Sequence, residues 1–336
     1  MNKRLGFIAV FTIFSAIISN DYIPIHNTPQ ENPIFKTEQT QSISEPAPSS
    51  SDFLTVDLVL TKPDTDELHI SNQLPDGRTL LTKFKKTPWG TWNIANWFSS
   101  DSYLAGDSDW EYVFRVSESP DSGYYFSGGA HGRERLNNLK IFDGINNTPS
   151  NVEVGSHSIH KLIKIIEETS LTFDAEMTKE YARVQRIYLI SPSKITLNTT
   201  ITFTNKVFMG TSYVCMFPVS KEYGRYIKFN DTGTVIATPP TGKTLTNGGF
   251  ENFLGREKTL SVNLWGDANP NYQFKIWIDN ENMVDGFNNS LKTFYWDCNI
   301  FGNKLYFSKY DNDKPNVIEP GTVWYHVQGW ELHVTS

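Results

Sequence analysis

The residue types best suited to chemistry are concentrated in one short stretch, 123–144, with the sequence GYYFSGGAHGRERLNNLKIFDG. Three glycines in the hexapeptide that contains His131 permit backbone conformations closed to other residues, so the imidazole can approach a ligand closely. A histidine exchanges a proton near neutral pH, Arg133 can bind a carboxylate through two hydrogen bonds, and Glu134 can orient the histidine. The stretch therefore predicts a catalytic loop. The alternative is a tight structural loop in which these side chains only satisfy neighbouring backbone groups.

A second basic group for such a site is predicted in the strand-like run 181–188. Arg183 and Arg186 are three residues apart, so in a strand they face opposite sides and at most one of them points into a shared site. An arginine opposite His131 would neutralise the carboxylate of a uronate sugar. The alternative for Arg183 is a solvated or ion-paired residue on the surface of a sheet.

Aromatic side chains recur on the less apolar faces of strands predicted in the C-terminal third of the chain. Flat rings stack on the C–H faces of sugar rings while amides and amines bond the hydroxyls, so these faces predict a sugar-binding groove. The alternative is that a second sheet or a loop covers them and makes the aromatic residues part of the core. The residues that alternation places on these faces are Trp265, Lys275, Trp277, Tyr306, Trp324 and His326.

The elements that must position these residues are predicted to be strands of an antiparallel all-β domain. Alternating and β-branched runs recur after residue 52 with turn residues between them. The run 194–203 is the cleanest, with Ile195 and Leu197 on one face and Lys194 and Thr196 on the other, so one side is buried and the other solvated. The run 158–168 approximates helical spacing, but its β-branched residues fit a strand equally well.

The N-terminal part of the chain has the pattern of an export signal. Lys3 and Arg4 precede an apolar run within 1–20, which predicts a signal peptide or an uncleaved N-terminal membrane anchor. Residues 21–51 are rich in Pro, Gln, Ser and Thr and are predicted to be a disordered linker. Residues 52–336 are predicted to form a single β-sandwich domain, and the chain is expected to be secreted, periplasmic or displayed on the cell surface.

Composition excludes several classes of partner. The net charge of −7 provides no basic surface for nucleic acid. His157 and His160 have a spacing compatible with metal binding on a helix, but no further ligand accompanies them, so no metal or cofactor is predicted. Cys215 and Cys298 are expected to be two buried thiols or a single bridge. The sequence gives no prediction of the oligomeric state.

A family resemblance follows from three segments: GGAHGRE, the central SKITLNTTITFTNKVFMGTSYVCMFPVS, and the closing NKLYFS with GTVWYHVQGWELHV. With its length and predicted strands, the chain resembles galactose-mutarotase-like β-supersandwich proteins, including the β-sandwich modules of polysaccharide lyases. It also resembles phage-tail and bacterial-surface proteins that carry a Gly-Gly-x-His-Gly-x-Glu stretch. The resemblance implies a two-sheet antiparallel β-sandwich that acts on carbohydrate. The Asn-His motif, second histidine and late glutamate of aldose epimerases are not found here, so mutarotase activity is not implied.

Two functional hypotheses remain open. In the first, the protein is an exported polysaccharide lyase: Arg133 or Arg183 neutralises a uronate carboxylate, and His131 or Tyr213 removes the adjacent C–H proton. In the second, the same groove binds a glycan without cleaving it, as in an adhesion module. A third alternative is a purely structural surface domain.

Overall fold

The computed structural model describes residues 56–245, 252–269, 272–284, 293–310 and 316–335, which belong to one compact unit, Pro46–Ser336. The predicted signal segment 1–20 and linker 21–51 lie outside the described residues and remain predictions. No helix in the described part of the chain is long and apolar enough to cross a membrane.

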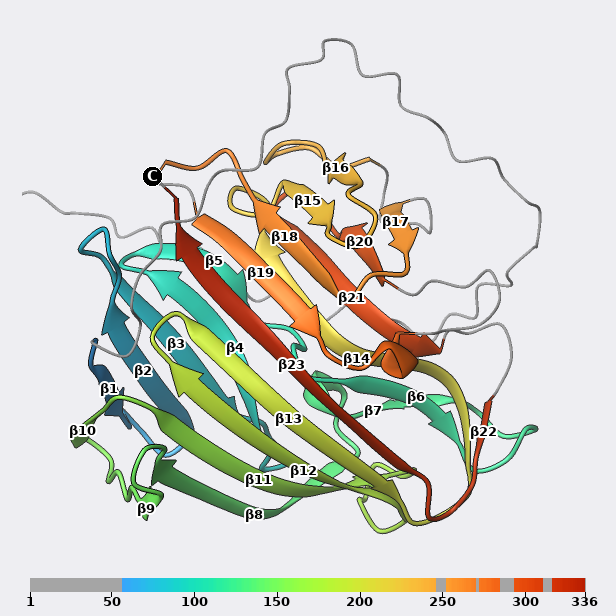
Figure 1. Cartoon of the computed structure of the whole chain (residues 1–336). Coiled ribbons are helices and arrows are strands. Elements are labelled where there is room, and N and C mark those ends of the chain that lie inside the picture. The colour runs from blue at the N-terminus through green and yellow to red at the C-terminus, as the bar shows by residue number, and fades with distance from the viewer. Residues whose placement is uncertain (1–55, 246–251, 270–271, 285–292, 311–315, 336) are drawn as a thin grey trace, which may run out of the picture. The chain divides into compact units, whose positions relative to one another are not determined.

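The described residues form two antiparallel sheets, which confirms the predicted two-sheet β-sandwich (Figure 1). The first sheet has thirteen strands, with the main order β10-β1-β2-β3-β4-β5-β14-β21-β20-β17. Off this path, β6 and β22 both pair with β14, and β7 pairs with β6. Its strands are β1 (Leu58–Thr61), β2 (Glu67–Gln73), β3 (Thr79–Lys86), β4 (Trp92–Ser99), β5 (Ser102–Gly106), β6 (Val113–Ser117), β7 (Tyr125–Ser127), β10 (His157–His160), β14 (Val207–Ser220), β17 (Phe253–Glu257), β20 (Thr293–Asp297), β21 (Gly302–Tyr310) and β22 (Asn316–Ile318).

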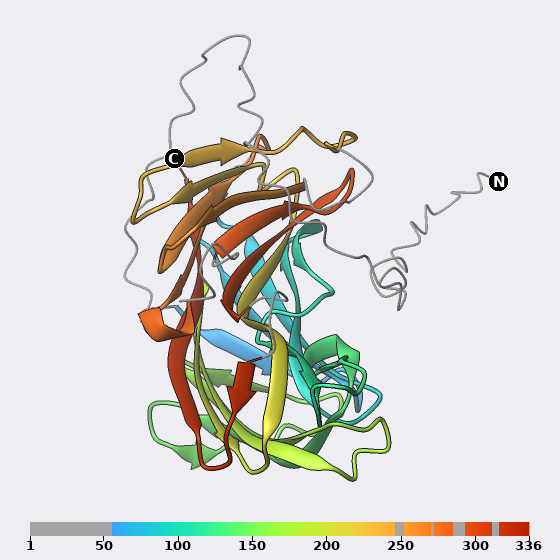
Figure 2. The ribbon, with the colours of Figure 1, turned by 90° about the vertical axis from the view of Figure 1, so that its right-hand side faces the viewer.

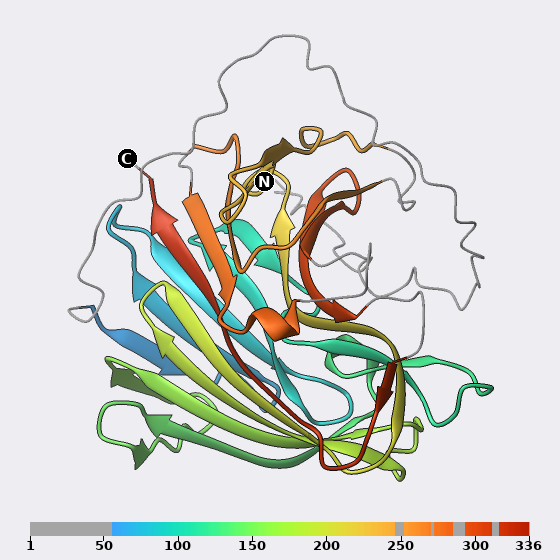
Figure 3. The ribbon, with the colours of Figure 1, turned by 45° about the vertical axis from the view of Figure 1, so that its right-hand side comes forward.

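The second sheet has ten strands in the order β16-β15-β18-β19-β23-β13-β12-β11-β8-β9. Its members are β8 (Glu134–Asp143), β9 (Thr148–Pro149), β11 (Ile163–Thr172), β12 (Glu180–Ser191), β13 (Lys194–Phe203), β15 (Tyr226–Phe229), β16 (Val235–Ala237), β18 (Ser261–Trp265), β19 (Tyr272–Ile278) and β23 (Val323–Val334). Figure 3 shows β1 to β4, in blue and cyan, behind the layer of β11, β12, β13 and β23. Two short 3-10 helices, η2 (Gly129–His131) and η4 (Glu281–Met283), lie between strands.

The main core fills the space between the two sheets. On β13 the prediction is confirmed in full, because Ile195, Leu197, Ile201 and Phe203 are buried while every second residue is partly exposed. An aromatic group at the centre joins the sheets: Trp110 contacts both Phe217 (ring centroids 5.0 Å apart) and Trp330 (5.8 Å). The run 158–168 is extended and contributes to β10 and β11, so of the two alternatives the strand is correct.

The long strand β14 positions the candidate site. One part of it pairs with β21, and the preceding part pairs with β6 and β22 (Figure 2). Because side chains alternate along a strand, β21 directs Leu305 and Phe307 into the main core and Lys304 and Tyr306 to the other face of the sheet. We call this other face, which points away from the ten-stranded sheet, the outer face of the thirteen-stranded sheet.

Candidate active site

The loop that carries His131 is a tight turn between β7 and β8. The backbone amide of Gly128 donates to the carbonyl of Gly132 (2.9 Å), and the amide of His131 donates to the carbonyl of Gly128 (3.1 Å). Gly129 has φ +54°, and a Cβ built on it would lie 2.1 Å from Oδ1 of Asp109. Glycine is therefore required at this position because the Asp109 carboxylate occupies the space where a side chain would begin.

Asp109 is the buried partner of this loop. Its Oδ1 accepts the backbone N–H of Ala130, and its Oδ2 lies 3.6 Å from Nε2 of His131. Burial alone would raise the pKa of this carboxyl, but the nearby charge of Lys304 and the hydrogen bonds from His131 and Ala130 hold the pKa well below its usual range. Asp109 is therefore ionised at neutral pH and can fix the orientation of the imidazole, which is 28% exposed.

Lys304 completes this group of charges from β21. Its Nζ lies 3.6 Å from Oδ2 of Asp109, donates to Oγ of Ser108 (2.7 Å) and lies 5.1 Å from the ring centre of Tyr306. Burial lowers the pKa of Lys304, and the charge of Asp109 opposes this effect. Lys304 thus connects the charged group to the neighbouring aromatic rings.

Those rings form a second hydrophobic cluster, which we call the outer aromatic cluster. The Tyr306 ring lies 4.8 Å from that of Phe294 and 4.6 Å from that of Tyr213, and the Phe126 ring lies 4.9 Å from that of His131. The cluster gathers side chains of β6, β7, β14, β17, β20 and β21, which are Val113, Phe126, Tyr213, Met216, Phe253, Phe294, Trp296 and Tyr306. His131, Tyr213 and Tyr306 were all predicted as site residues, and the fold brings them into one region of the outer face of the thirteen-stranded sheet.

Arg133 lies at the edge of this region. One of its terminal nitrogens donates to the backbone carbonyl of Phe126 (3.1 Å), and its guanidinium carbon lies 4.5 Å from the ring centre of Tyr125. Arg115 is the cross-strand neighbour of Phe126. Arg133 therefore borders the His131 loop at Phe126, Arg115 lies over the ring of Tyr124 (5.3 Å), and Lys304 adds a positive group beneath the loop.

Glu134 does not orient His131, contrary to the prediction. Its side chain is fully buried and accepts hydrogen bonds from the hydroxyls of Tyr112 (2.6 Å) and Thr169 (2.7 Å). Arg186, also fully buried, lies 3.5 Å from Glu134 and 2.7 Å from Glu167. Glu134 begins β8 and points between the sheets, so the predicted role of orienting the imidazole falls to Asp109.

Arg183 and Arg186 point to opposite faces of β12, as predicted, but neither reaches His131. Arg183 is 72% exposed on the outer face of the ten-stranded sheet, where its Nε donates to Glu180 (2.9 Å). The predicted convergence of Arg183 with His131 is therefore wrong, because the two side chains lie on the outer faces of different sheets.

Trp324 and His326 lie inside the sandwich rather than on a solvated face. The Trp324 ring packs against Phe203 (4.8 Å) and Phe114 (5.8 Å). His326 is fully buried, shares a hydrogen bond with Gln328 (2.8 Å) and has its pKa lowered to about 4 by burial. The less apolar face of β23 is the one that the opposite sheet covers, so neither residue is accessible to a glycan.

Trp265, Lys275 and Trp277 lie on the outer face of the ten-stranded sheet, away from His131. Trp265 is 3% exposed and stacks on Tyr226 (5.7 Å), whereas Trp277 is partly exposed and donates from Nε1 to Glu331 (3.1 Å). The single predicted groove is therefore divided between two sheets and the interior of the sandwich.

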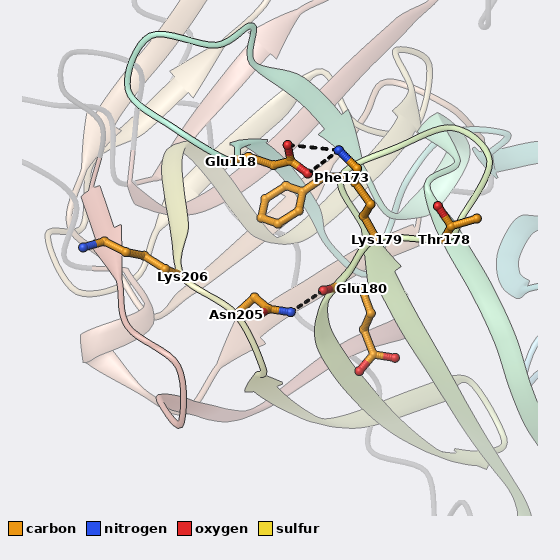
Figure 4. A pocket seen from close by; sticks show the side chains of 7 residues that line it. All are labelled: Glu118, Phe173, Thr178, Lys179, Glu180, Asn205 and Lys206. Atoms are coloured by element: carbon orange, nitrogen blue, oxygen red, sulfur yellow. Dashed lines mark hydrogen bonds and ion pairs between the residues drawn. The ribbon is translucent and has the colours of Figure 1, made fainter.

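A shallow depression of about 640 Å³ lies beside the start of β12 (Figure 4). Two of its charged groups pair with each other, since Nζ of Lys179 lies 3.0 Å from Glu118, and the Asn205 side chain donates to the backbone carbonyl of Glu180 (2.7 Å). None of the predicted site residues lines it. Within the described ranges, no group of three or more His, Cys, Asp or Glu side chains is arranged to hold a metal ion.

Asp109 and Lys304 are the site residues that sequence reasoning did not identify. Lys304 stands two residues before Tyr306, so strand alternation places it on the same face as this predicted site residue, and that is the sequence signal for it. No sequence signal identifies Asp109, because its contact with the His131 loop joins residues that are about 20 positions apart in the sequence.

Comparisons with known proteins give similarities of fold only. No family model and no curated protein sequence matches the chain. Solved structures similar to it include an α-galactosidase from Lactobacillus brevis (TM-score 0.45, 9% identity, covering 82% of this chain and 40% of that protein). They also include a galactose 1-epimerase from Lactobacillus acidophilus (TM-score 0.37, 8% identity, 83% and 99% covered) and a putative aldose 1-epimerase from Escherichia coli (0.36, 10%, 76% and 96%). The chain thus spans less than half the length of the α-galactosidase, and none of these similarities carries a functional argument.

Proposed function

We propose that the protein is an exported, carbohydrate-active enzyme of the polysaccharide-lyase type that acts on a uronate-containing glycan. The observation that carries the proposal is the pairing of a partly exposed His131 with the buried, ionised Asp109, beside the outer aromatic cluster. A base, a group that orients it, positive charges and aromatic rings are the parts that such a reaction requires.

The chemistry starts from the orientation of the imidazole. Nε2 lies 3.6 Å from Oδ2 of Asp109, so we assign the imidazole hydrogen to Nε2, and in this tautomer Nδ1 is the basic nitrogen. His131 takes the proton from C5 of the uronate, the electron pair forms the C4=C5 double bond, and the bond from C4 to the glycosidic oxygen breaks. The departing oxygen receives a proton from the Tyr213 hydroxyl or from water.

Positive charge near the site supports the proposal that the substrate is acidic. Removing a proton next to a carboxylate is easier when positive groups neutralise that carboxylate, because they stabilise the additional negative charge that it takes up as the proton leaves. Arg133 supplies this charge in place of Arg183, which lies on the outer face of the other sheet. The partly buried rings of Tyr213 and Phe126 supply flat surfaces for the sugar, and the buried Tyr306 ring supports Tyr213 from below.

The alternative is a glycan-binding module without catalysis. One observation favours it: Asp109 and Lys304 are almost fully buried and pair with each other, so a ligand reaches His131 more readily than either of them. In that case the same face holds the uronate polymer and the histidine only donates a hydrogen bond.

Turnover of uronate polymers separates these two functions. We expect the protein to release unsaturated products that absorb in the near ultraviolet from at least one of polygalacturonate, alginate or a glycosaminoglycan. His131→Ala should lower turnover by about 100-fold or more without unfolding the protein. The matched control is His69→Ala, which removes another histidine that pairs with a carboxylate, here Glu67 at 2.7 Å, and should leave turnover unchanged. Tight binding of a uronate polymer with no unsaturated product would establish the binding module instead.

A further inference from the structure

A polar groove crosses the outer face of the ten-stranded sheet, on a different sheet from His131. It has a volume of about 540 Å³ and lies over β8, β11, β12 and β13, which run side by side in Figure 1. No apolar side chain except Val184 lines it. We call it the outer groove.

Strand register aligns side chains of the outer groove in two rows, which continue beyond its lining to Asn138 on β8 and to Tyr325 and Val323 on β23. The first row crosses the sheet through directly opposed residues, in the order Asn138, Glu168, Gln185, Thr200 and Tyr325. The second row, displaced by two residues along each strand of β11, β12, β13 and β23, consists of Arg135, Ser170, Arg183, Thr202 and Val323. Four strand spacings separate β8 from β23, so the rows extend about 19 Å, which is long enough for several linked sugars.

The lining of the groove mixes hydrogen-bond donors with acceptors and balances its charges. Glu168 accepts two long hydrogen bonds, one from Asn138 and one from Gln185 (both 3.3 Å). Arg183 uses its Nε for Glu180, and among the described residues no protein group bonds its terminal nitrogens. Two arginines and two glutamates line the groove, so it does not select a charged ligand, whereas amides, hydroxyls and guanidinium groups in rows suit sugar hydroxyls.

Tyr325 supplies an aromatic surface at the β23 end of the first row. Its side chain is 51% exposed on the solvated face of β23, directly opposite Thr200. An exposed ring next to a row of hydrogen-bonding groups is the combination that binds a pyranose, through stacking on its C–H face and bonds to its hydroxyls. An exposed tyrosine also loses little conformational freedom when it is covered by a ligand.

We propose that the outer groove is a second carbohydrate site, which binds a neutral oligosaccharide or polysaccharide chain across β8 to β23. It does not depend on the proposed reaction at His131, since the two sites lie on the outer faces of different sheets. The site would hold a neutral segment of a glycan without cleaving it.

Affinity electrophoresis of the full chain tests this proposal. Gels contain galactomannan, xyloglucan, soluble starch or mixed-linkage β-glucan, with polygalacturonate as the acidic comparison. We expect at least one neutral polymer to retard the protein, and Tyr325→Ala, Arg183→Ala and Gln185→Ala each to weaken this retardation about tenfold. The matched control is Phe301→Ala, which removes an equally exposed aromatic ring (58%) away from the groove and should leave retardation unchanged.

The outcomes that overturn the proposal are distinct from those that bear on His131. It fails if none of the four neutral polymers retards the protein, if Phe301→Ala weakens retardation as much as Tyr325→Ala, or if only polygalacturonate binding depends on Arg183. Turnover of a uronate polymer, where present, should be unaffected by Tyr325→Ala. A loss of turnover in that variant would mean that the groove belongs to the catalytic site and is not a separate one.

Discussion

The α-carbon of Gly129 lies against the carboxylate of Asp109, so closely that an added Cβ would be 2.1 Å from Oδ1. This contact closes the His131 loop onto the segment that precedes β6, and the same carboxylate faces the imidazole through its other oxygen. The loop and its buried carboxylate therefore form one unit, and the contact between them depends on glycine at position 129.

Gly129→Ala should destabilise the protein more than a glycine replacement that meets no neighbour. Gly77 has φ +82° and open space around it, so Gly77→Ala costs only the backbone strain, about 1 kcal/mol of unfolding free energy. Gly129→Ala adds a clash with Asp109, which we expect to cost about 1–3 kcal/mol more. Chemical denaturation of both variants measures the difference, and equal losses would show that the carboxylate moves aside freely.

Arg186→Met should be strongly destabilising, whereas Arg183→Met on the same strand should not. Arg186 is the cation beside the buried Glu167 and Glu134, so its removal leaves uncompensated charge and should cost about 3–5 kcal/mol. Arg183 makes an exposed ion pair, for which we expect a loss below about 1 kcal/mol. Denaturant unfolding provides the measurement, and a small effect of Arg186→Met would contradict the buried network.

Stability should fall as the pH rises through the titration of Glu167. Burial raises the pKa of this carboxyl to about 7, although the charge of Arg186 opposes the shift and the nearby carboxyls of Glu134 and Glu111 add to it. The folded state therefore binds more protons than the unfolded state between about pH 4.5 and 7, so the contribution of Glu167 is present at lower pH and is lost across this window.

Thermal unfolding of the wild type and of Glu167→Gln between pH 5 and 8 isolates this effect, because the variant cannot titrate at this position. We expect the stability of the variant relative to the wild type to increase as the pH rises. Glu168→Gln removes a carboxylate from the other face of β11 and should follow the wild-type profile. A constant difference between wild type and Glu167→Gln would contradict the raised pKa.

Gly329→Ala should displace the Trp277 ring from the sheet. A Cβ at this position would lie 2.6 Å from three atoms of the indole, including Nε1. We expect a loss of about 1–3 kcal/mol of unfolding free energy and an altered tryptophan emission spectrum. In a Trp277→Leu background the same change should cost much less, and a fully additive double-mutant cycle would show that the two residues are not coupled.

The local sequence pattern was enough to predict which residues share a face of an individual strand. On β13 the alternation of apolar and polar residues predicted the buried side chains correctly, and on β12 it separated Arg183 from Arg186. The concentration of glycines around His131 indicated a special loop, and the loop does carry positive φ angles at Gly128, Gly129 and Gly132. These properties follow from the two-residue period of a strand and from the freedom of glycine, so neighbouring residues are enough to predict them.

Tertiary structure decided which face of each strand meets solvent and which distant residues meet. On β23 the face with Trp324, His326 and Gln328 is covered by the opposite layer, where the segment before β6 provides the backbone carbonyl of Glu111 for Gln328 (3.1 Å), while Tyr325 is left exposed. Alternation cannot predict this, because the free energy of burying a polar face depends on partners that the opposite sheet supplies. Asp109 and Lys304 escaped prediction for the same reason. Asp109 lies 3.6 Å from both His131 and Lys304, and only the folded chain brings these three residues together.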